Sequence, residues 1–362
     1  MPSTRTGSQF TKADNRLIII ANPTAGVSAG RTNRQRLIES AQRDLERAGF
    51  HVDVGLENSS DAVVALAEHA VRKGYRYVVA AGGDGTVNSV VNGIMRLGEH
   101  SSPRNAALLK EVAFGVIPLG TGNVFAFNMR IGRTWREACQ TIRTGYIRSI
   151  DVGLARALPP HPTSKVAPKP PAGESETTLG NEVRPKPSKR RYFLLMAGIG
   201  FDAKVVEDTS LRLKYVLRDF AYVLMTLQNV VLHQGTQVTL RFKDGRVYAN
   251  EAWLVMVGNA ASYAWDIKVT SKARLDDGVL DICLMPFENK LISIQQALQI
   301  LMGQHLERGI AHYWKTQSVQ IISDPPIPIQ LDGDEWGYTP VEISVVPGVL
   351  NVLAPPEIPL PT

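Results

Sequence analysis

GGDGTVNSVVNGI, residues Gly82–Ile94, follows a short apolar run, Tyr77–Ala81, and opens a segment whose apolar residues recur at helical spacing. A continuous apolar run of this length is typical of a strand buried on both faces. Glycines at a strand-to-helix turn let main-chain N–H groups approach phosphate oxygens, and the helix points its positive end there. Asp84 is suited to hold Mg²⁺, and Thr86 is suited to cap the helix. The stretch predicts a phosphate-binding turn, with a plain tight turn as the alternative.

Two further polar turns favour the phosphate-binding interpretation. PLGTGN (Pro118–Asn123) follows the apolar run Val112–Ile117, and NPTAG (Asn22–Gly26) follows Leu17–Ala21. Because strands alternate with helical segments here, the sequence predicts a doubly wound α/β domain. In such a domain the turns after strands one, three and four face one crevice, where nucleotides bind. The chain has neither the Gly-Lys-Ser/Thr of a Walker A loop nor GxGxxG at these turns, which argues against a Rossmann redox enzyme.

The α/β pattern stops at Ala155–Arg191, which holds eight of the 22 prolines and reads as a low-complexity linker. Short strands with turn residues follow it and predict an antiparallel β-sandwich. Two helices are predicted among them, at Leu211–Leu232 and Ile292–Leu306. The predicted division is an α/β nucleotide-binding domain over 14–150, an insertion over 155–191, a β-rich substrate domain over 192–330, and a segment over 331–362. Whether that last segment returns to the first domain is open. The strand candidates are Tyr192–Ala197, Gln237–Phe242, Val247–Val257, Val279–Met285, Val319–Ile322, Ile327–Leu331 and Val341–Val345.

Two turns in the second half carry acidic residues. LDDGVLD (Leu275–Asp281) has the carboxylates and glycine of a loop that binds a hard cation, but a hairpin with solvated carboxylates explains it equally well. LDGDE (Leu331–Glu335) gathers three acids after an apolar run, and a hairpin turn explains its Asp-Gly pair. Three clustered acids beside Trp336 also fit a catalytic base or a metal site.

Composition excludes several classes of protein. Two cysteines among 362 residues cannot form a disulfide framework or a Cys-rich zinc site. The seven histidines show no metal-ligand spacing, and the N-terminal residues lack the apolar stretch of a signal peptide. The longest apolar stretch, Phe220–Leu232, is shorter than the roughly 20 residues that a spanning helix needs. No basic helix or aromatic-basic motif indicates nucleic-acid binding.

Five motifs taken together resemble the diacylglycerol kinase catalytic-domain family, which includes bacterial lipid kinases related to diacylglycerol and sphingosine kinases. GGDGT alone is shared with NAD kinases, whereas GGDGT followed by GTGN and GFDA is much more specific. The resemblance covers nearly the whole chain except Ala155–Arg191 and the termini. The motifs are GGDGTVNSVVNGI (Gly82–Ile94), IPLGTGNVFA (Ile117–Ala126), GIGFDA (Gly198–Ala203), LDDGVLD (Leu275–Asp281) and LDGDE (Leu331–Glu335).

The resemblance implies an α/β nucleotide domain, a β-sandwich domain and a cleft between them in which ATP and Mg²⁺ serve to phosphorylate a lipid hydroxyl. It implies Asp332 as the catalytic base, with Asp334 as second candidate, and Asp84 beside the phosphates and Mg²⁺. It likens LDDGVLD to a structural metal loop in which Asp277 gives its side chain and Arg274 and Val279 give carbonyl oxygens. The residues expected around the nucleotide are Asn22, Pro23, Thr24, Ala25, Gly26, Gly82, Gly83, Asp84, Gly85, Thr86, Gly120, Thr121, Gly122 and Asn123.

The sequence departs from the family pattern at two positions, and these leave other functions open. Val124 stands where the family often has Asp after GTGN, and Asp334 stands where it has Glu. One alternative is a kinase with a soluble acceptor, of the NAD kinase type. Another is a nucleotide-responsive lipid-binding protein without catalysis. A helix over Leu211–Leu232 would line an apolar channel for acyl chains, or simply cover the sheet.

The net charge of +6 is concentrated in the insertion, where eight basic residues face three acidic ones. RPKPSKRR (Arg184–Arg191) therefore suggests an electrostatic contact with anionic lipid, and a solvated linker is the alternative. Together these observations predict a cytoplasmic enzyme, peripheral at the inner membrane face, with a lipid substrate and no nucleic-acid partner. The oligomeric state is open, a homodimer included.

Overall fold

The computed structural model describes residues 15–23, 31–99, 102–159, 189–200, 235–262 and 267–356. Several sequence-based predictions lie outside these residues: Thr24–Gly26 of the first turn, most of the proline-rich insertion, Phe201–Ala203 of the GFDA motif, and the predicted helix Leu211–Leu232.

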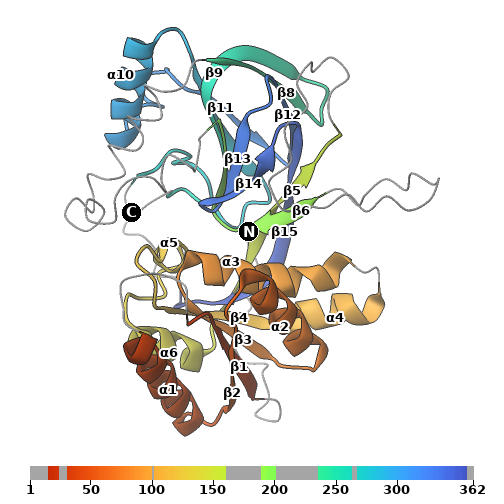
Figure 1. Ribbon diagram of the computed structural model, residues 1–362, viewed down its shortest axis with the longest axis vertical. Coiled ribbons are helices and arrows are strands. Elements are labelled where there is room, and N and C mark those ends of the chain that lie inside the picture. The colour runs from red at the N-terminus through yellow and green to blue at the C-terminus, as the bar shows by residue number, and fades with distance from the viewer. Residues whose placement is uncertain are drawn as a thin grey trace.

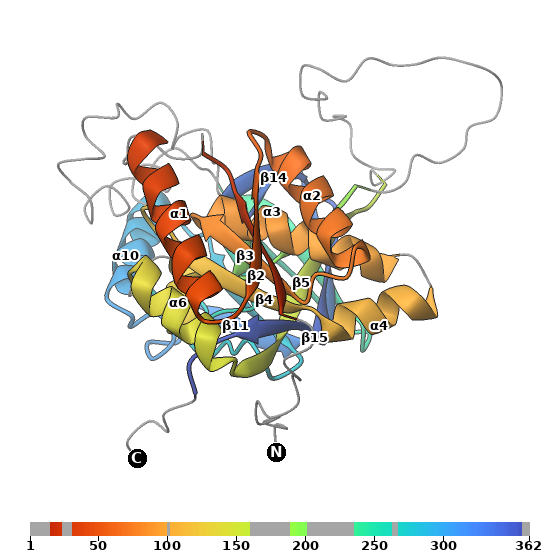
Figure 2. The same cartoon turned by 90° about the horizontal axis from the view of Figure 1, so that it is seen from below.

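The described chain forms two lobes, an α/β lobe and a β-rich lobe (Figure 1). In the α/β lobe, four parallel strands lie in the order β4-β3-β1-β2. Helices α1 and α6 cover one face of this sheet and α2, α3 and α4 cover the other, as Figure 2 shows from below. The elements of this lobe are β1 (Arg16–Ala21), α1 (Arg31–Arg47), β2 (His51–Leu56), α2 (Ser60–Arg72), β3 (Tyr77–Gly82), α3 (Asp84–Met95), the 3₁₀ helix η1 (Arg96–Glu99), α4 (Pro103–Glu111), β4 (Ala113–Pro118), α5 (Val124–Asn128) and α6 (Trp135–Thr144).

Burial explains why these segments are strands. Every residue of β3 and of β4 is buried, as expected for central strands of a parallel sheet that has helices on both faces. Every residue of the outer strand β2 is exposed or half-buried, as expected at the edge of the sheet, and Val54 and Leu56 are among the exposed ones. Helix α3 packs closely on α2, because a Cβ on Gly93 would lie 2.4 Å from the carbonyl oxygen of Val64. This contact fixes the direction of the helix that follows GGDGT.

The second lobe is built from antiparallel pairs, as the sequence predicts. Strand β9 is central and pairs with β7, β8 and β10, while β12 lies between β8 and β15. The elements are β5 (Ile147–Ala157), β6 (Arg190–Phe193), β7 (Met196–Ile199), β8 (Thr236–Phe242), β9 (Val247–Gly258), β10 (Leu280–Pro286), α10 (Lys290–Leu301), β11 (His312–Thr316), β12 (Ser318–Asp324), β13 (Pro328–Leu331), β14 (Asp334–Tyr338) and β15 (Val341–Leu353).

One long strand, β15, joins the two lobes. It pairs with β5 along most of its length, and at Val352 it pairs in parallel with Phe114 of β4. The chain after residue 331 therefore runs from the β-rich lobe into the sheet of the α/β lobe (Figure 1). One buried apolar cluster spans the α/β lobe and the adjoining side of the second lobe, and another fills the interior of the second lobe.

Several predicted elements differ from the observed ones: the strand expected at Val341–Val345 runs on to Leu353 as β15, and β5, β11 and β14 are strands that the sequence did not predict. The expected strand Tyr192–Ala197 is two strands, β6 and β7, because the chain bends at Leu194 and Leu195, whose N–H groups bind the Asp332 carboxylate rather than a neighbouring strand. The expected helix Ile292–Leu306 begins two residues earlier and ends at Leu301, where α10 gives way to turns. Among the described residues no helix combines the length and hydropathy needed to cross a bilayer.

Candidate active site

The turns after β3 and β4 lie against each other and are joined by Asp84. Its Oδ2 accepts a hydrogen bond from the Val124 N–H at 3.1 Å, and its Oδ1 accepts one from the Phe125 N–H at 3.0 Å. The carboxylate therefore caps helix α5, whose own N-cap residue, Asn123, makes no side-chain cap bond. Asn123 has a left-handed backbone and instead closes its own turn, exchanging hydrogen bonds with the main chain of Gly120 at 3.0 and 2.9 Å.

Three glycines make this close approach possible. A Cβ on Gly120 would lie 2.4 Å from the Cα of Gly83, and a Cβ on Gly122 would lie 3.1 Å from Oδ2 of Asp84. Side chains at these positions would push the two turns apart. The two motifs that the sequence predicts to be adjacent are thus in direct backbone contact.

The start of helix α3 has no side-chain cap. Its N-cap residue is Gly83, and no side chain accepts from the first N–H groups. Thr86, expected to be the cap, has its hydroxyl buried over Gly82, where a Cβ would lie only 2.4 Å away. The sequence-based prediction of a Thr86 cap is therefore wrong, because the close packing of the turn draws this hydroxyl inward.

Gly85 differs from the other glycines of the turn. A Cβ at this position would meet nothing within 4 Å, and its φ is not positive, so the fold does not require glycine here. Glycine in open space at the first turn of an uncapped helix fits the close approach of a ligand to the backbone. Asn22 and Pro23 lie half-buried at the end of β1, beside β3, whereas Thr121 is exposed on the second turn.

Asp332 stands at the junction of the two lobes. Its Oδ2 accepts from the Leu194 N–H at 2.7 Å and from Asn88 Nδ2 at 2.8 Å. Its Oδ1 accepts from the N–H groups of Leu195 at 2.8 Å and Met196 at 3.0 Å. Four donors occupy the roughly four acceptor positions of a carboxylate. Burial raises the pKa of Asp332, and the hydrogen bonds from the backbone and from Asn88 oppose that rise.

Helix α3 carries the partners that bring Asp332 beside the GGDGT turn. Asn88 follows Asp84 by one helical turn, so the two side chains emerge from the same side of α3. Asn92, a further turn along, accepts from the Tyr192 N–H at 2.9 Å and donates to the Tyr192 carbonyl at 3.0 Å. Its amide therefore pairs with strand β6 as a neighbouring strand would. Neither asparagine was singled out from sequence, although both lie in the GGDGTVNSVVN stretch at helical spacing.

Asp334 lies on the exposed side of the same turn. Its carboxylate accepts from Arg191 Nη2 at 2.5 Å, and Arg191 also donates to Asn88 Oδ1 at 3.0 Å. Arg191 therefore links Asp334, Asn88 and, through Asn88, Asp332. The basic run that the sequence assigns to the insertion ends in this residue, which belongs to the site.

The LDDGVLD loop holds its carboxylates by internal contacts. Asp276 binds Arg148 at 2.7 Å and Arg274 at 3.2 Å. Burial would raise the pKa of Asp276, but these two guanidinium groups bring it below its usual value. Asp277 accepts from Lys315 at 2.8 Å, and no cluster of three or more acidic, histidine or cysteine side chains in the described part of the chain is placed to hold a metal ion.

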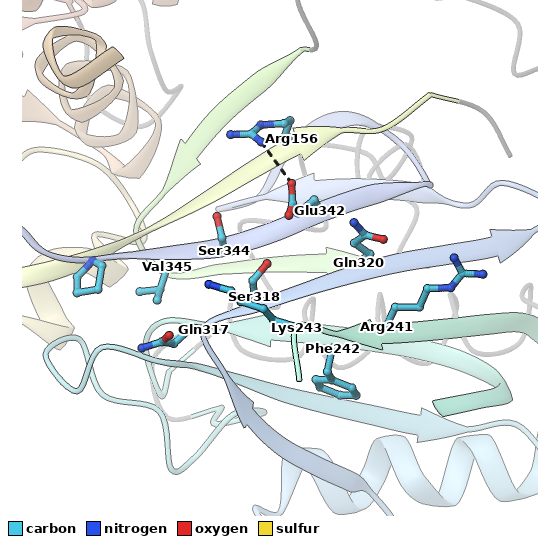
Figure 3. A pocket seen from close by; sticks show the side chains of 11 residues that line it. Arg156, Arg241, Phe242, Lys243, Gln317, Ser318, Gln320, Glu342, Ser344 and Val345 are labelled. Carbon is cyan, nitrogen blue, oxygen red and sulfur yellow. Dashed lines mark hydrogen bonds and ion pairs between the residues drawn. The ribbon is translucent and has the colours of Figure 1, made fainter. Parts of the chain in front are cut away.

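A separate hollow of about 560 Å³ lies on the outer face of the β-rich lobe (Figure 3). Arg156, Arg241 and Glu342 are among the side chains that line it, with an ion pair between Arg156 and Glu342. None of the predicted catalytic or nucleotide-binding residues lines it. It is therefore not the candidate active site.

Comparisons with known proteins agree with this arrangement. Residues 16–155 match the diacylglycerol kinase catalytic domain, and residues 196–354 match the YegS C-terminal NAD kinase beta sandwich-like domain. Together these two matches span most of the chain, so the chain belongs to the diacylglycerol kinase catalytic-domain family.

Named relatives and solved structures give the same assignment. A probable lipid kinase YegS-like of Chromohalobacter salexigens is 27% identical over 318 residues, covering 88% of each chain. A diacylglycerol kinase of Bacillus subtilis is 26% identical over 341 residues, covering 94% of this chain and 96% of the relative. A solved chain from Bacillus anthracis, 22% identical, has a TM-score of 0.71 and covers 97% of this chain and 98% of its own. That likeness establishes the same fold. Membership of a kinase family implies the use of ATP.

The Asn92 contacts generate a first prediction. Asn92→Ala should lower the free energy of unfolding by about 1–3 kcal/mol, because it leaves the N–H of the buried Tyr192 without its partner and removes the shorter of the two amide bonds to the Tyr192 carbonyl, the other coming from Asn88. The matched control is Asn128→Ala, which removes only a bond to Val124 within the same short helix and should change stability by about 0.5 kcal/mol or less. Urea denaturation measures both. Equal losses in the two variants would contradict the bridging role of Asn92.

Proposed function

We propose that this protein transfers the γ-phosphate of ATP to a hydroxyl group of a lipid, diacylglycerol or a related molecule. The observation that carries the proposal is the uncapped start of α3, which abuts the GTGN turn and lies one helical turn from the Asn88–Asp332 contact. The proposed phosphate-binding end of α3 and the Asn88 side chain that binds the Asp332 carboxylate thus lie on the same side of one helix. Phosphoryl transfer requires this proximity of phosphate and proton acceptor.

The nucleotide phosphates would lie at the N-terminus of α3. Main-chain N–H groups of Gly83–Gly85 and the helix dipole favour negative charge there, and the GTGN turn provides the opposite wall. Asp84 is the residue that would hold Mg²⁺, since it is half-buried and each of its oxygens accepts one N–H and keeps a further lone pair. Mg²⁺ bound with the nucleotide would neutralise phosphate charge.

Asp332 is the proposed acceptor of the hydroxyl proton. A carboxylate with an ordinary pKa is a weak base for an alcohol, and the burial that raises the pKa of Asp332 strengthens it. The lipid hydroxyl would take the place of Asn88 as donor to Oδ2. Asn88 can give up that bond because its Nδ2 also donates to the Tyr192 carbonyl, at 3.3 Å.

Asp334 is proposed as a positioning residue. Asp334 binds Arg191, and Arg191 binds the side chain of Asn88. Asp334 therefore acts on Asp332 indirectly, through the position of Asn88. Asp334 is exposed, and its carboxylate is paired with the Arg191 guanidinium. Both features suit a positioning role better than direct proton transfer. The shorter side chain of Asp, compared with the Glu of related proteins, reaches Arg191 without difficulty.

The proposal includes contact with a lipid surface. A membrane lipid must reach a site at the junction of the lobes. The sequence that leads into β6 carries three basic residues, Arg184, Lys186 and Lys189, besides Arg190 and Arg191, which pair with Glu99 and Asp334. The attraction of basic residues to an anionic surface is worth up to about 1 kcal/mol per residue and weakens as salt is added.

The decisive experiment offers labelled ATP with diacylglycerol, other lipid alcohols and NAD, the lipids being presented both in neutral micelles and in anionic vesicles. Lipid phosphorylation is expected, faster on anionic vesicles at low salt. Asp332→Asn should lower kcat by at least about 100-fold, because it removes the proton acceptor. Asp334→Asn should cost less, about tenfold. Transfer to NAD alone, or ATP binding without transfer to any acceptor, would refute the proposal; the opposite order of the two variants would exchange their roles.

The same assay gives a pH dependence. The reaction needs ionised Asp332, so kcat/KM should fall as the pH drops through the pKa of this residue. Because burial raises that pKa, the acid limb should lie above 3.8, the ordinary value. A limb at or below the ordinary value would argue against Asp332 as the base.

Gly85→Ala tests the nucleotide site without disturbing the fold. The added methyl meets no protein atom within 4 Å and favours the helix, so stability should be unchanged or slightly raised. It would occupy the space expected for phosphate, and the KM for ATP should rise about tenfold or more. Gly98→Ala, whose Cβ makes an ordinary 3.4 Å contact with Leu109, is the control. An unchanged KM in Gly85→Ala would move the phosphates away from α3.

A further inference from the structure

Lys315 and Asp281 face each other across the last two strands of one sheet edge. Strand β11 pairs with β10, and in this register Asp281 of LDDGVLD lies directly opposite Lys315. Opposite charges in such cross-strand pairs attract each other. Lys315 Nζ lies 3.6 Å from Asp281 Oδ2 and 2.8 Å from Asp277 Oδ2. One ammonium group therefore pairs with two of the three carboxylates of the loop.

Asp281 is the group that needs this charge. Its side chain is wholly buried, and Oδ1 accepts a hydrogen bond from the Tyr313 hydroxyl at 2.7 Å. Its Oδ2 is buried and has no hydrogen-bond partner among the described residues. A buried carboxylate oxygen without a partner is costly unless a cation lies beside it. The Lys315 ammonium, on the neighbouring strand, lies 3.6 Å from this oxygen.

Lys315 is surrounded by oxygen atoms of the chain, as a bound metal ion would be. Nζ also lies 3.4 Å from the Lys272 carbonyl oxygen. Two carboxylates and a main-chain carbonyl are the ligand types of a hard divalent cation. Asp277 Oδ2 is committed to Lys315 and its Oδ1 accepts from the Val279 N–H at 3.4 Å. The residues present therefore do not fit a divalent ion in addition to the ammonium group.

We propose that Lys315 is the internal cation of the LDDGVLD loop and takes the position that a structural divalent ion would otherwise occupy. The β-rich lobe is then held without bound metal, and any divalent requirement of the protein belongs to the α/β lobe alone. The sequence-based expectation of a metal held by Asp277, Arg274 and Val279 is replaced by an ion-pair network supplied by the chain.

The first test uses the full-length wild-type chain. After gel filtration it should contain no stoichiometric Mg²⁺, Ca²⁺ or Mn²⁺ by elemental analysis, and excess EDTA should leave its Tm unchanged. Stoichiometric metal, or a Tm that EDTA lowers by about 5 °C or more, would overturn the proposal if Asp277→Asn abolished it, because metal held at Asp84 would survive that substitution. Neither measurement depends on kinase activity, so the lipid-kinase proposal stands or falls separately.

The second test replaces the cation. Lys315→Met keeps the length of the side chain and removes its charge, and should lower Tm by about 5 °C or more. Millimolar Ca²⁺ or Mg²⁺ should restore part of that loss, because the two carboxylates then lack a cation, and Lys315→Arg should retain the wild-type Tm and remain insensitive to the ions. Lys243→Met, on the exposed β8–β9 turn, is the control for loss of one surface charge.

Three results of the second test would count against the proposal. A Tm loss no larger than that of Lys243→Met would mean that the ammonium does not stabilise the loop. A loss that neither ion restores would mean that the loop is not a cation position. Restoration that persists in Lys315→Met combined with Asp277→Asn would place the added ion elsewhere.

Discussion

The structure depends on one carboxylate, Asp332, held at the junction of two lobes. Three successive backbone N–H groups, from Leu194 to Met196, and the amide of Asn88 bind it. Because those N–H groups are turned toward the carboxylate, the chain cannot form one continuous strand there and divides into β6 and β7. The same interaction brings the C-terminal LDGDE turn against helix α3. A single anion therefore sets both the strand pattern of the second lobe and the position of the candidate base.

The second constraint is the contact between the GGDGT and GTGN turns. Asp84 caps the helix that follows the other turn, and glycines allow the two backbones to touch. Asp84 is thus required for the shape of the site before any ligand binds. The helix it begins, α3, is left uncapped, and it also carries Asn88 and Asn92 toward the other lobe. The proposed phosphate site and the contact between the lobes consequently belong to one element, helix α3.

The two acidic turns of the second half have different physical roles, although both combine Asp with glycine. In LDGDE, neutral amide donors surround the buried Asp332, so its carboxylate remains near the α3 terminus without a neutralising cation. In LDDGVLD, Arg148, Arg274 and Lys315 pair with the three carboxylates. Carboxylates that are paired with cations in this way stabilise the loop and are chemically unreactive. The electrostatic surroundings, rather than the motif, distinguish the turn that carries the proposed base from the turn held by ion pairs.

The sequence by itself determined most elements of the α/β lobe, because buried parallel strands and glycine turns have local signatures, and the resemblance of five motifs to a known family indicated the class of protein. Gly82–Gly85 and Gly120–Asn123 could be predicted as neighbours from the alternation of strands and helices alone. Tertiary structure decided what each polar side chain does. The partners of Asp332 are 136 or more residues away in sequence, and Lys315 is 38 residues from Asp277. No local pattern encodes such pairs, since they depend on how β6, β11 and α3 are brought together by sheet register and by burial.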